Sequence, residues 1–177
     1  MLSGLTQAMI VNGAVLFAVL EGDLGPSRRI GPLRILRPVL VAAAVIPLFV
    51  DRPATHGDSL LVEVAGILAG LLGGLAAAGL MRVYRSPETG KPVSRAGLPY
   101  AMLWILVVGA RAAFSYGSVH WFGAQLDQWC LAHQVTAAGI TDGLIFMALA
   151  MVLVRTTALA TRARRLPTAS AQTPVTV

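Results

Sequence analysis

The chain has 177 residues, of which 56% are hydrophobic and only 12% are charged, and its formal net charge is +6. Soluble domains carry about 25% charged residues. A water-soluble fold of this length would therefore lack the polar surface that keeps it in solution. This composition excludes a disordered chain, a nucleic-acid-binding domain and most cytosolic enzymes, and it favours a small bundle of membrane-spanning helices.

Five segments are long and apolar enough to be membrane spans. A helix needs about 20 mainly apolar residues to cross a hydrocarbon core of about 30 Å, and only a helix or a closed barrel satisfies its backbone in lipid. The second segment is the weakest, because Arg37, Pro38 and Pro47 interrupt it, and Pro47 should kink or end that helix. The predicted spans are residues 2–20, 33–50, 59–81, 98–117 and 135–154.

The basic residues predict how these spans are oriented. Twelve of the fourteen Lys and Arg residues fall in three segments, four in each: Arg28, Arg29, Arg34 and Arg37; Arg82, Arg85, Lys91 and Arg95; Arg155, Arg162, Arg164 and Arg165. Because cytoplasmic loops carry the excess of Lys and Arg, the N-terminus is predicted outside and the C-terminus in the cytoplasm. The positive charge therefore records topology in a bacterial plasma membrane and does not indicate a nucleic-acid partner.

Aromatic residues are predicted to form belts at the two membrane surfaces, as Trp and Tyr commonly do. Tyr84 and Tyr100 flank the inner surface, and Tyr116, Trp121 and Trp129 flank the outer one. These rings are interpreted as anchors of the bundle at the lipid headgroups.

The segments between and after the spans differ in character. Residues 84–92 have turn chemistry, with Gly90 suited to a positive φ. Residues 118–134 repeat apolar side chains at helical spacing, which is typical of a short amphipathic helix on the outer surface. This segment serves either as a lid or as a plain connection. Residues 1–165 are predicted to form one transmembrane domain, and residues 166–177 a disordered cytoplasmic tail.

Three charged residues lie inside the predicted spans. Glu63, Arg111 and Asp142 fall in spans three, four and five, at depths of roughly 5 to 10 Å below the outer surface, given a rise of about 1.5 Å per residue. A charge at a helix centre costs about 3 kcal/mol, which makes such residues functional candidates. They form either an ion pair of Arg111 with Asp142 that fixes helix packing, or a polar site that binds a ligand. Gln7 and Asn12 in the first span are candidates to line the same site.

The remaining candidates are metal ligands and a packing face. His120, His133 and Cys130 have ligand chemistry, but the two histidines fall on nearly opposite faces of a continuous helix. We therefore predict no metal or cofactor, with a metal or haem site as the alternative.

In span three, small residues repeat every fourth position and predict close helix contact, either within the chain or as a homodimer seam: Gly66, Gly70 and Gly74.

The segment from Arg34 to Tyr116 resembles the CcdC-like family of small bacterial membrane proteins. The resemblance is carried by Arg37-Pro38 entering span two, a Gly-rich span three ending in Leu80-Met81-Arg82-Val83, a connector ending in Val93-Ser94-Arg95, and Arg111 late in span four. It covers about half of the chain. It implies a fold type and an association with cytochrome c maturation genes, and no defined activity.

These observations predict an all-α, five-span protein of the bacterial plasma membrane. Its predicted function is to bind a lipid-like small molecule or a protein partner through an outward-facing polar pocket formed by Glu63, Arg111 and Asp142. One alternative is a membrane enzyme acting on a lipid or isoprenoid, with a carboxylate as acid or base. The other is a transporter or channel subunit, which would require a continuous polar path through the helices.

Overall fold

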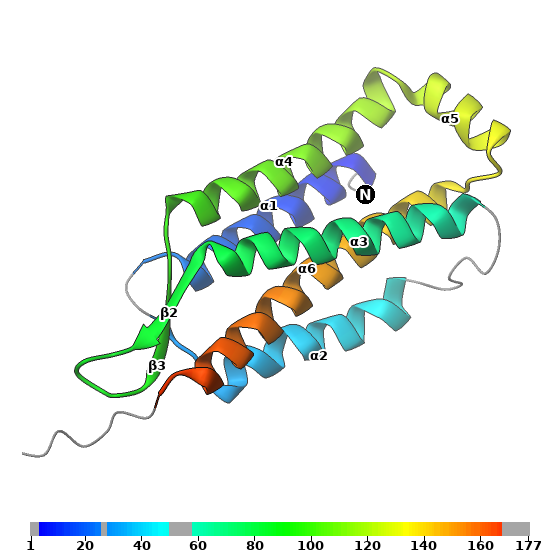
Figure 1. The fold of residues 1–177 in the computed structure, drawn as a ribbon. Helices are drawn as coiled ribbons and strands as arrows, with labels where there is room; N and C mark the ends of the chain where they lie inside the picture. The colour runs from blue at the N-terminus through cyan, green and yellow to red at the C-terminus, as the bar shows by residue number, and fades with distance from the viewer. Residues whose placement is uncertain (1–3, 26–27, 50–57, 168–177) are drawn as a thin grey trace, which may run out of the picture.

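The computed structural model describes residues 4–25, 28–49 and 58–167. Within these ranges the chain forms long helices that run alongside one another, one short helix and a small sheet (Figure 1). The mostly helical bundle agrees with the predicted fold class, and the small sheet is an addition that the prediction did not include. The elements are α1 (Gly4–Asp23), β1 (Arg28–Arg29), α2 (Pro32–Phe49), α3 (Asp58–Gly79), β2 (Met81–Arg85), β3 (Pro92–Ala96), α4 (Leu98–His120), α5 (Gly123–Ala132) and α6 (Ala137–Arg165).

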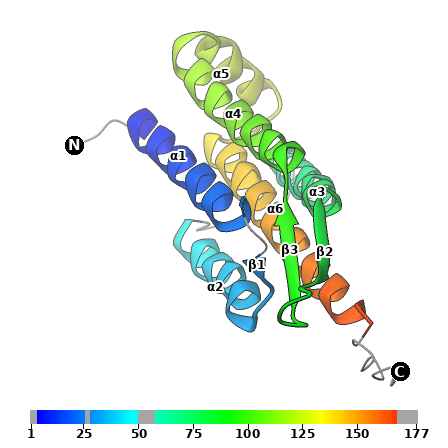
Figure 2. The same ribbon diagram turned by 90° about the vertical axis from the view of Figure 1, so that its left-hand side faces the viewer.

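The bundle has two different ends, seen from two directions in Figures 1 and 2. At one end, which we name the sheet end, α1, α3 and α6 finish, α2 and α4 begin, and the three strands lie against them. At the opposite end, which we name the α5 end, the short helix α5 connects the end of α4 to the start of α6.

Helices α3 and α6 form the most extensive contact in the bundle, and they run in the same direction. Gly66 of α3 faces the backbone of Gly143, Gly70 faces that of Met147, and a Cβ placed on Gly74 would lie 2.7 Å from the carbonyl oxygen of Met151. The absence of side chains on this face lets the two helix backbones approach closely. The glycine stripe therefore packs within the chain, and a homodimer through the same face would require α6 to move away.

The sheet is an antiparallel hairpin with one added strand. β2 pairs with β3 from Met81 opposite Ala96 to Arg85 opposite Pro92, and β1 pairs with the other edge of β3. Gly90 adopts φ 62° in the turn, which agrees with its predicted role, because a residue without a Cβ enters this region freely. The sequence prediction recognised the turn but assigned Met81 to the preceding helix and missed the strands.

The exposed surface of the bundle is largely apolar. Large side chains such as Leu61, Leu72 and Leu106 are 65%, 70% and 69% exposed, as expected where lipid replaces water around a helix. Three helices of the described chain are long and apolar enough to cross a membrane: α3, α4 and α6. Helices α1 and α2 cover the two other predicted segments.

Helix boundaries near the chain's second half differ from the prediction. α6 continues to Arg165, eleven residues beyond the predicted end of span five, so that its last turns lie beside the sheet. α5 confirms a short helix within residues 118–134, and none of its residues is buried. At the start of the predicted tail, the carbonyl groups of Leu166 and Pro167 accept hydrogen bonds from Arg85. Residues 168–177 lie outside the described chain.

Candidate functional site

At the α5 end, two carboxylates are buried beside the contact of α3 with α6. Glu63 is 4% exposed and Asp142 is 7% exposed. The residues next to them in the sequence, Val62 and Gly143, are in close contact: a Cβ on Gly143 would lie 3.1 Å from the carbonyl oxygen of Val62. The two carboxylates are thus at the same level of two contacting helices, as the comparison of depths predicted.

The start of α6 is fixed against α3 by hydrogen bonds of small polar groups. The Thr136 hydroxyl caps α6 by accepting from the Gly139 amide at 3.0 Å, the ordinary role of Thr at a helix N-cap. The Thr136 amide in turn donates to the Ser59 hydroxyl of α3 at 3.3 Å. These bonds set the position of the first turns of α6 and so the position of Asp142.

Arg111 brings α4 to the same level. Its guanidinium donates to the carbonyl oxygen of Leu144 at 3.2 Å, two residues after Asp142 on α6, and the residue is half-buried. The arginine therefore faces the bundle near the carboxylates. Its predicted ion pair with Asp142 stays a prediction.

The other predicted site residues fall into three groups. Asn12 is buried on α1, at 8% exposed, whereas the side chain of Gln7 lies outside the described part of the structure. His120 stacks on Tyr116 and His133 stacks on Trp129, each within one helical turn of its partner. Among the described residues no three His, Cys, Asp or Glu side chains gather as a metal site would require.

The sheet end contains a buried charged cluster that the sequence prediction missed. The carboxylate of Asp23, only 3% exposed, lies at its centre. Its Oδ1 accepts from Arg34 at 2.6 Å, and its Oδ2 accepts from the Tyr100 hydroxyl at 2.5 Å and from Arg155. The cluster therefore ties together α1, α2, α4 and α6.

The cluster extends into the sheet. Arg34 also donates to the hydroxyl of Ser94 on β3 at 3.0 Å, and Ser94 is fully buried. Arg155 donates to the Tyr100 hydroxyl as well as to Asp23. Side chains from four helices and one strand thus form one hydrogen-bonded network, which we name the Asp23 cluster: Asp23, Arg34, Ser94, Tyr100 and Arg155.

Three sequence interpretations are corrected by this cluster. Tyr100 is completely buried and is not an interfacial anchor. Arg155 was counted as a cytoplasmic loop cation, but α6 continues past it and its side chain is only 10% exposed. The first span was predicted to end at residue 20, although α1 continues to Asp23. Glu63, Arg111 and Asp142 are therefore not the only charges inside the bundle.

Other basic residues at the sheet end cap helices. Arg28 donates to the carbonyl oxygen of Glu21 near the end of α1, and Arg162 to that of Ala78 near the end of α3. Cations stabilise the last carbonyl groups of a helix, which no intrahelical amide satisfies. The arginines taken as topological signals thus also terminate helices.

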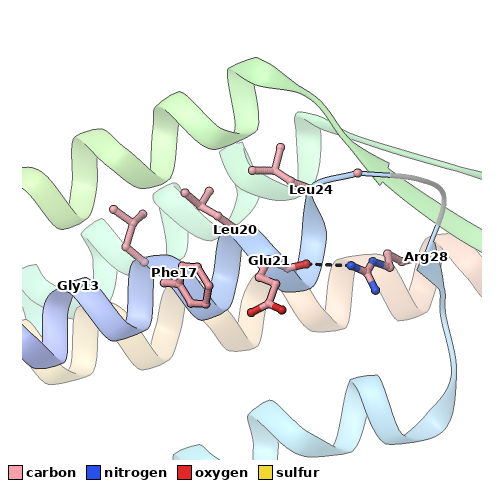
Figure 3. Close-up of a pocket in the computed structure, with 8 residues that line it drawn as sticks. Gly13, Phe17, Leu20, Glu21, Leu24 and Arg28 are labelled. Atoms are coloured by element: carbon pink, nitrogen blue, oxygen red, sulfur yellow. Dashed lines mark hydrogen bonds between the residues drawn. The ribbon is translucent and has the colours of Figure 1, made fainter.

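An open groove of about 640 Å³ lies along α1 (Figure 3). Its walls are apolar over most of its length, and its charged lining residues are Glu21 and Arg28 at the sheet end. The groove is separate in the fold from Glu63, Arg111 and Asp142, none of which lines it. It is lined by Gly13, Leu16, Phe17, Leu20, Glu21, Leu24, Gly25 and Arg28.

Comparisons with protein-family models, with curated proteins and with solved structures gave no match. The functional argument therefore depends on the geometry of the chain itself.

Proposed function

We propose that this chain is a five-span protein of the bacterial plasma membrane that binds a lipid-like small molecule or a protein partner through the polar site at its α5 end. In this proposal the α5 end faces outward and the sheet end faces the cytoplasm. Glu63, Arg111 and Asp142 form the site. The fold is proposed to be of the CcdC-like type.

The observation that supports the site most strongly is the position of Arg111. It reaches from α4 to the backbone of α6 beside Asp142, at the level where α3 places Glu63 in the bundle. In this proposal three helices contribute one charged side chain each to the site. Charged groups inside a membrane bundle are costly to keep, and they commonly mark ligand or ion sites.

The chemistry of Arg111 suits it to hold a ligand. A guanidinium has five N–H donors, and among the described residues the Arg111 guanidinium donates one hydrogen bond, to Leu144. In this proposal the other N–H groups of the guanidinium donate to an oxygen-rich head group. Electrostatic attraction is stronger in such a partly buried site than in water, so a single cation contributes substantially to affinity.

The proposal is tested by comparing wild type with Arg111→Gln, which removes the charge and keeps a shorter polar side chain. Both proteins are extracted from native membranes in a mild detergent, and the molecules bound to them are identified by native mass spectrometry. Arg95→Gln is the matched control, because Arg95 is an exposed cation on β3. We expect a bound species that Arg111→Gln loses and Arg95→Gln retains.

The stability of each variant is measured in the same detergent. A bound species retained by Arg111→Gln would contradict the proposal. So would the absence of any bound species from the wild-type protein.

A further inference from the structure

A small cavity lies beside the Asp23 cluster, between the start of α2 and the second half of α6, two helices that contact each other (Figure 1). Its volume is about 10 Å³, which is close to the smallest space that holds one guest of the size of water. Both cations of the cluster, Arg34 and Arg155, line this cavity. The described lining residues are Ile30, Arg34, Ile35, Arg155, Thr156 and Leu159.

The cluster beside the cavity contains more positive than negative charge. The guanidinium groups of Arg34 and Arg155 share the single carboxylate of Asp23, so one positive charge is in excess. Among the described residues the other buried carboxylates, Glu63 and Asp142, belong to the α5 end. An uncompensated charge is costly to bury, and an anion in the cavity would compensate this one.

Arg155 also has a donor that the cluster does not use. The residue is only 8% exposed, and its Nη1 donates to Asp23 and to the Tyr100 hydroxyl. Its Nε, in contrast, is buried and has no hydrogen-bond partner among the described residues. Because a buried donor without an acceptor destabilises the folded state, this side chain on the cavity wall needs a further acceptor.

The chemistry of the lining favours an anion over water. Apart from the arginines, the polar residue of the described lining is Thr156, and its hydroxyl already donates to the Val152 carbonyl at 2.7 Å. The donors that the lining offers are therefore guanidinium N–H groups, which bind anions through charge-assisted hydrogen bonds. Water accepts from the same groups, but it does not compensate the excess charge and it needs acceptors for its own protons.

We propose that this cavity binds one small monovalent anion, of the size of chloride, between Arg34 and Arg155. The anion accepts hydrogen bonds from Arg155 and compensates the excess positive charge. A halide is only slightly larger than water, whereas phosphate, sulfate and carboxylate groups exceed the cavity. The anion joins α2 to α6 and so adds to the stability that the Asp23 cluster provides. This site is separate from the proposed site at the α5 end and does not depend on it.

The anion is tested by thermal unfolding of the detergent-purified protein, with gluconate replaced stepwise by chloride or bromide at constant ionic strength. Gluconate is too large for the cavity. Because a ligand of the folded state raises the melting temperature with its concentration, we expect a rise of about 3–5 °C for each tenfold increase of halide above its dissociation constant. Equal melting temperatures in gluconate and in both halides would overturn the proposal.

The excess charge is tested by Arg34→Gln. This variant leaves Asp23 and Arg155 as a neutral pair, so its melting temperature should no longer depend on halide. Ser94→Ala is the matched control, because it removes a hydrogen bond of 3.0 Å from Arg34 but keeps both cations and lies outside the described lining. Ser94→Ala should melt at a lower temperature and keep the full halide response. A response that persists in Arg34→Gln, or that disappears in Ser94→Ala, would contradict the proposal.

The cavity itself is tested by filling it without a change of charge. Ile35→Phe enlarges a side chain of the lining, and Leu36→Phe is its matched control, because Leu36 is 49% exposed on the same helix and lies outside the described lining. Binding is measured directly by the broadening of the chloride NMR line in the presence of each protein. We expect broadening by wild type and Leu36→Phe that Ile35→Phe loses. Equal broadening by the two variants, or none by wild type, would overturn the proposal.

Discussion

The two ends of the bundle contain charged clusters of opposite composition. At the sheet end one carboxylate, Asp23, lies between two arginines, and both of its oxygens accept hydrogen bonds. At the α5 end one arginine, Arg111, lies near two buried carboxylates and donates to a backbone carbonyl. The Asp23 cluster joins four helices, whereas at the α5 end we propose that Arg111 binds a ligand.

This difference shows that burial of charge alone does not identify a functional site. Removing a charge from water is costly, and the cost is recovered only where the partners have good geometry and further hydrogen bonds. The Asp23 carboxylate meets that condition through Arg34, Arg155 and Tyr100. We therefore assign it to the stability of the fold, and we expect substitutions at the two ends to separate stability from binding.

The largest effect is expected from Asp23→Ala. It leaves Arg155 buried without its counterion, and breaking a buried pair in this way costs about 3–5 kcal/mol. Chemical unfolding in detergent measures the loss, with Asp127→Ala, an exposed residue of α5, as the control. An effect as small as that of Asp127→Ala would show that the Asp23 cluster does not hold the helices together.

Gly70→Leu tests the contact of α3 with α6 that joins the two ends. Its side chain would meet the Met147 backbone, and forced overpacking of this kind costs about 3 kcal/mol. Gly79→Leu is the control, because a Cβ there meets nothing within 4 Å. Thermal unfolding in detergent should show a clear loss for Gly70→Leu alone, and equal melting temperatures would contradict the packing described.

Arg111→Ala should have a smaller effect on stability than Asp23→Ala. It removes the hydrogen bond between α4 and α6 and a cation near two carboxylates, a loss of about 2 kcal/mol. The same unfolding measurement checks it. A loss equal to that of Asp23→Ala would make the α5 end a second structural junction, and wild-type stability would exclude the ion pair with Asp142.

The smallest effect is expected from Arg162→Ala at the sheet end. It removes a hydrogen bond of 2.6 Å to the carbonyl of Ala78 near the end of α3. Capping by a cation contributes about 0.3–1 kcal/mol. The loss of unfolding free energy should be larger than that caused by Arg164→Ala, a substitution of an exposed neighbour. Equal values for the two variants would show that Arg162 does not cap α3.

The helices were predictable because apolar runs of about 20 residues leave few alternatives in lipid. The glycine spacing of α3 likewise predicted a close contact, and the depths of Glu63 and Asp142 agreed with their level in the bundle. The Asp23 cluster was not predictable, because its members are far apart in the sequence, with 132 residues separating Asp23 from Arg155. Considered alone, each of them has the character of a loop residue or of a residue at the membrane surface. The hairpin was missed for a similar reason, since its short strands adjoin a predicted helix end.

The measurement that tests the account most directly is the side of the membrane on which each end lies. Cys130 on α5 is the single cysteine of the chain, and it is partly exposed. Intact cells are treated with a membrane-impermeant maleimide. The counterpart is the double variant Cys130→Ser, Lys91→Cys, whose single cysteine lies in the hairpin turn. The account predicts labelling of Cys130 in intact cells and of Lys91→Cys only after lysis. Labelling in the reverse order would contradict it.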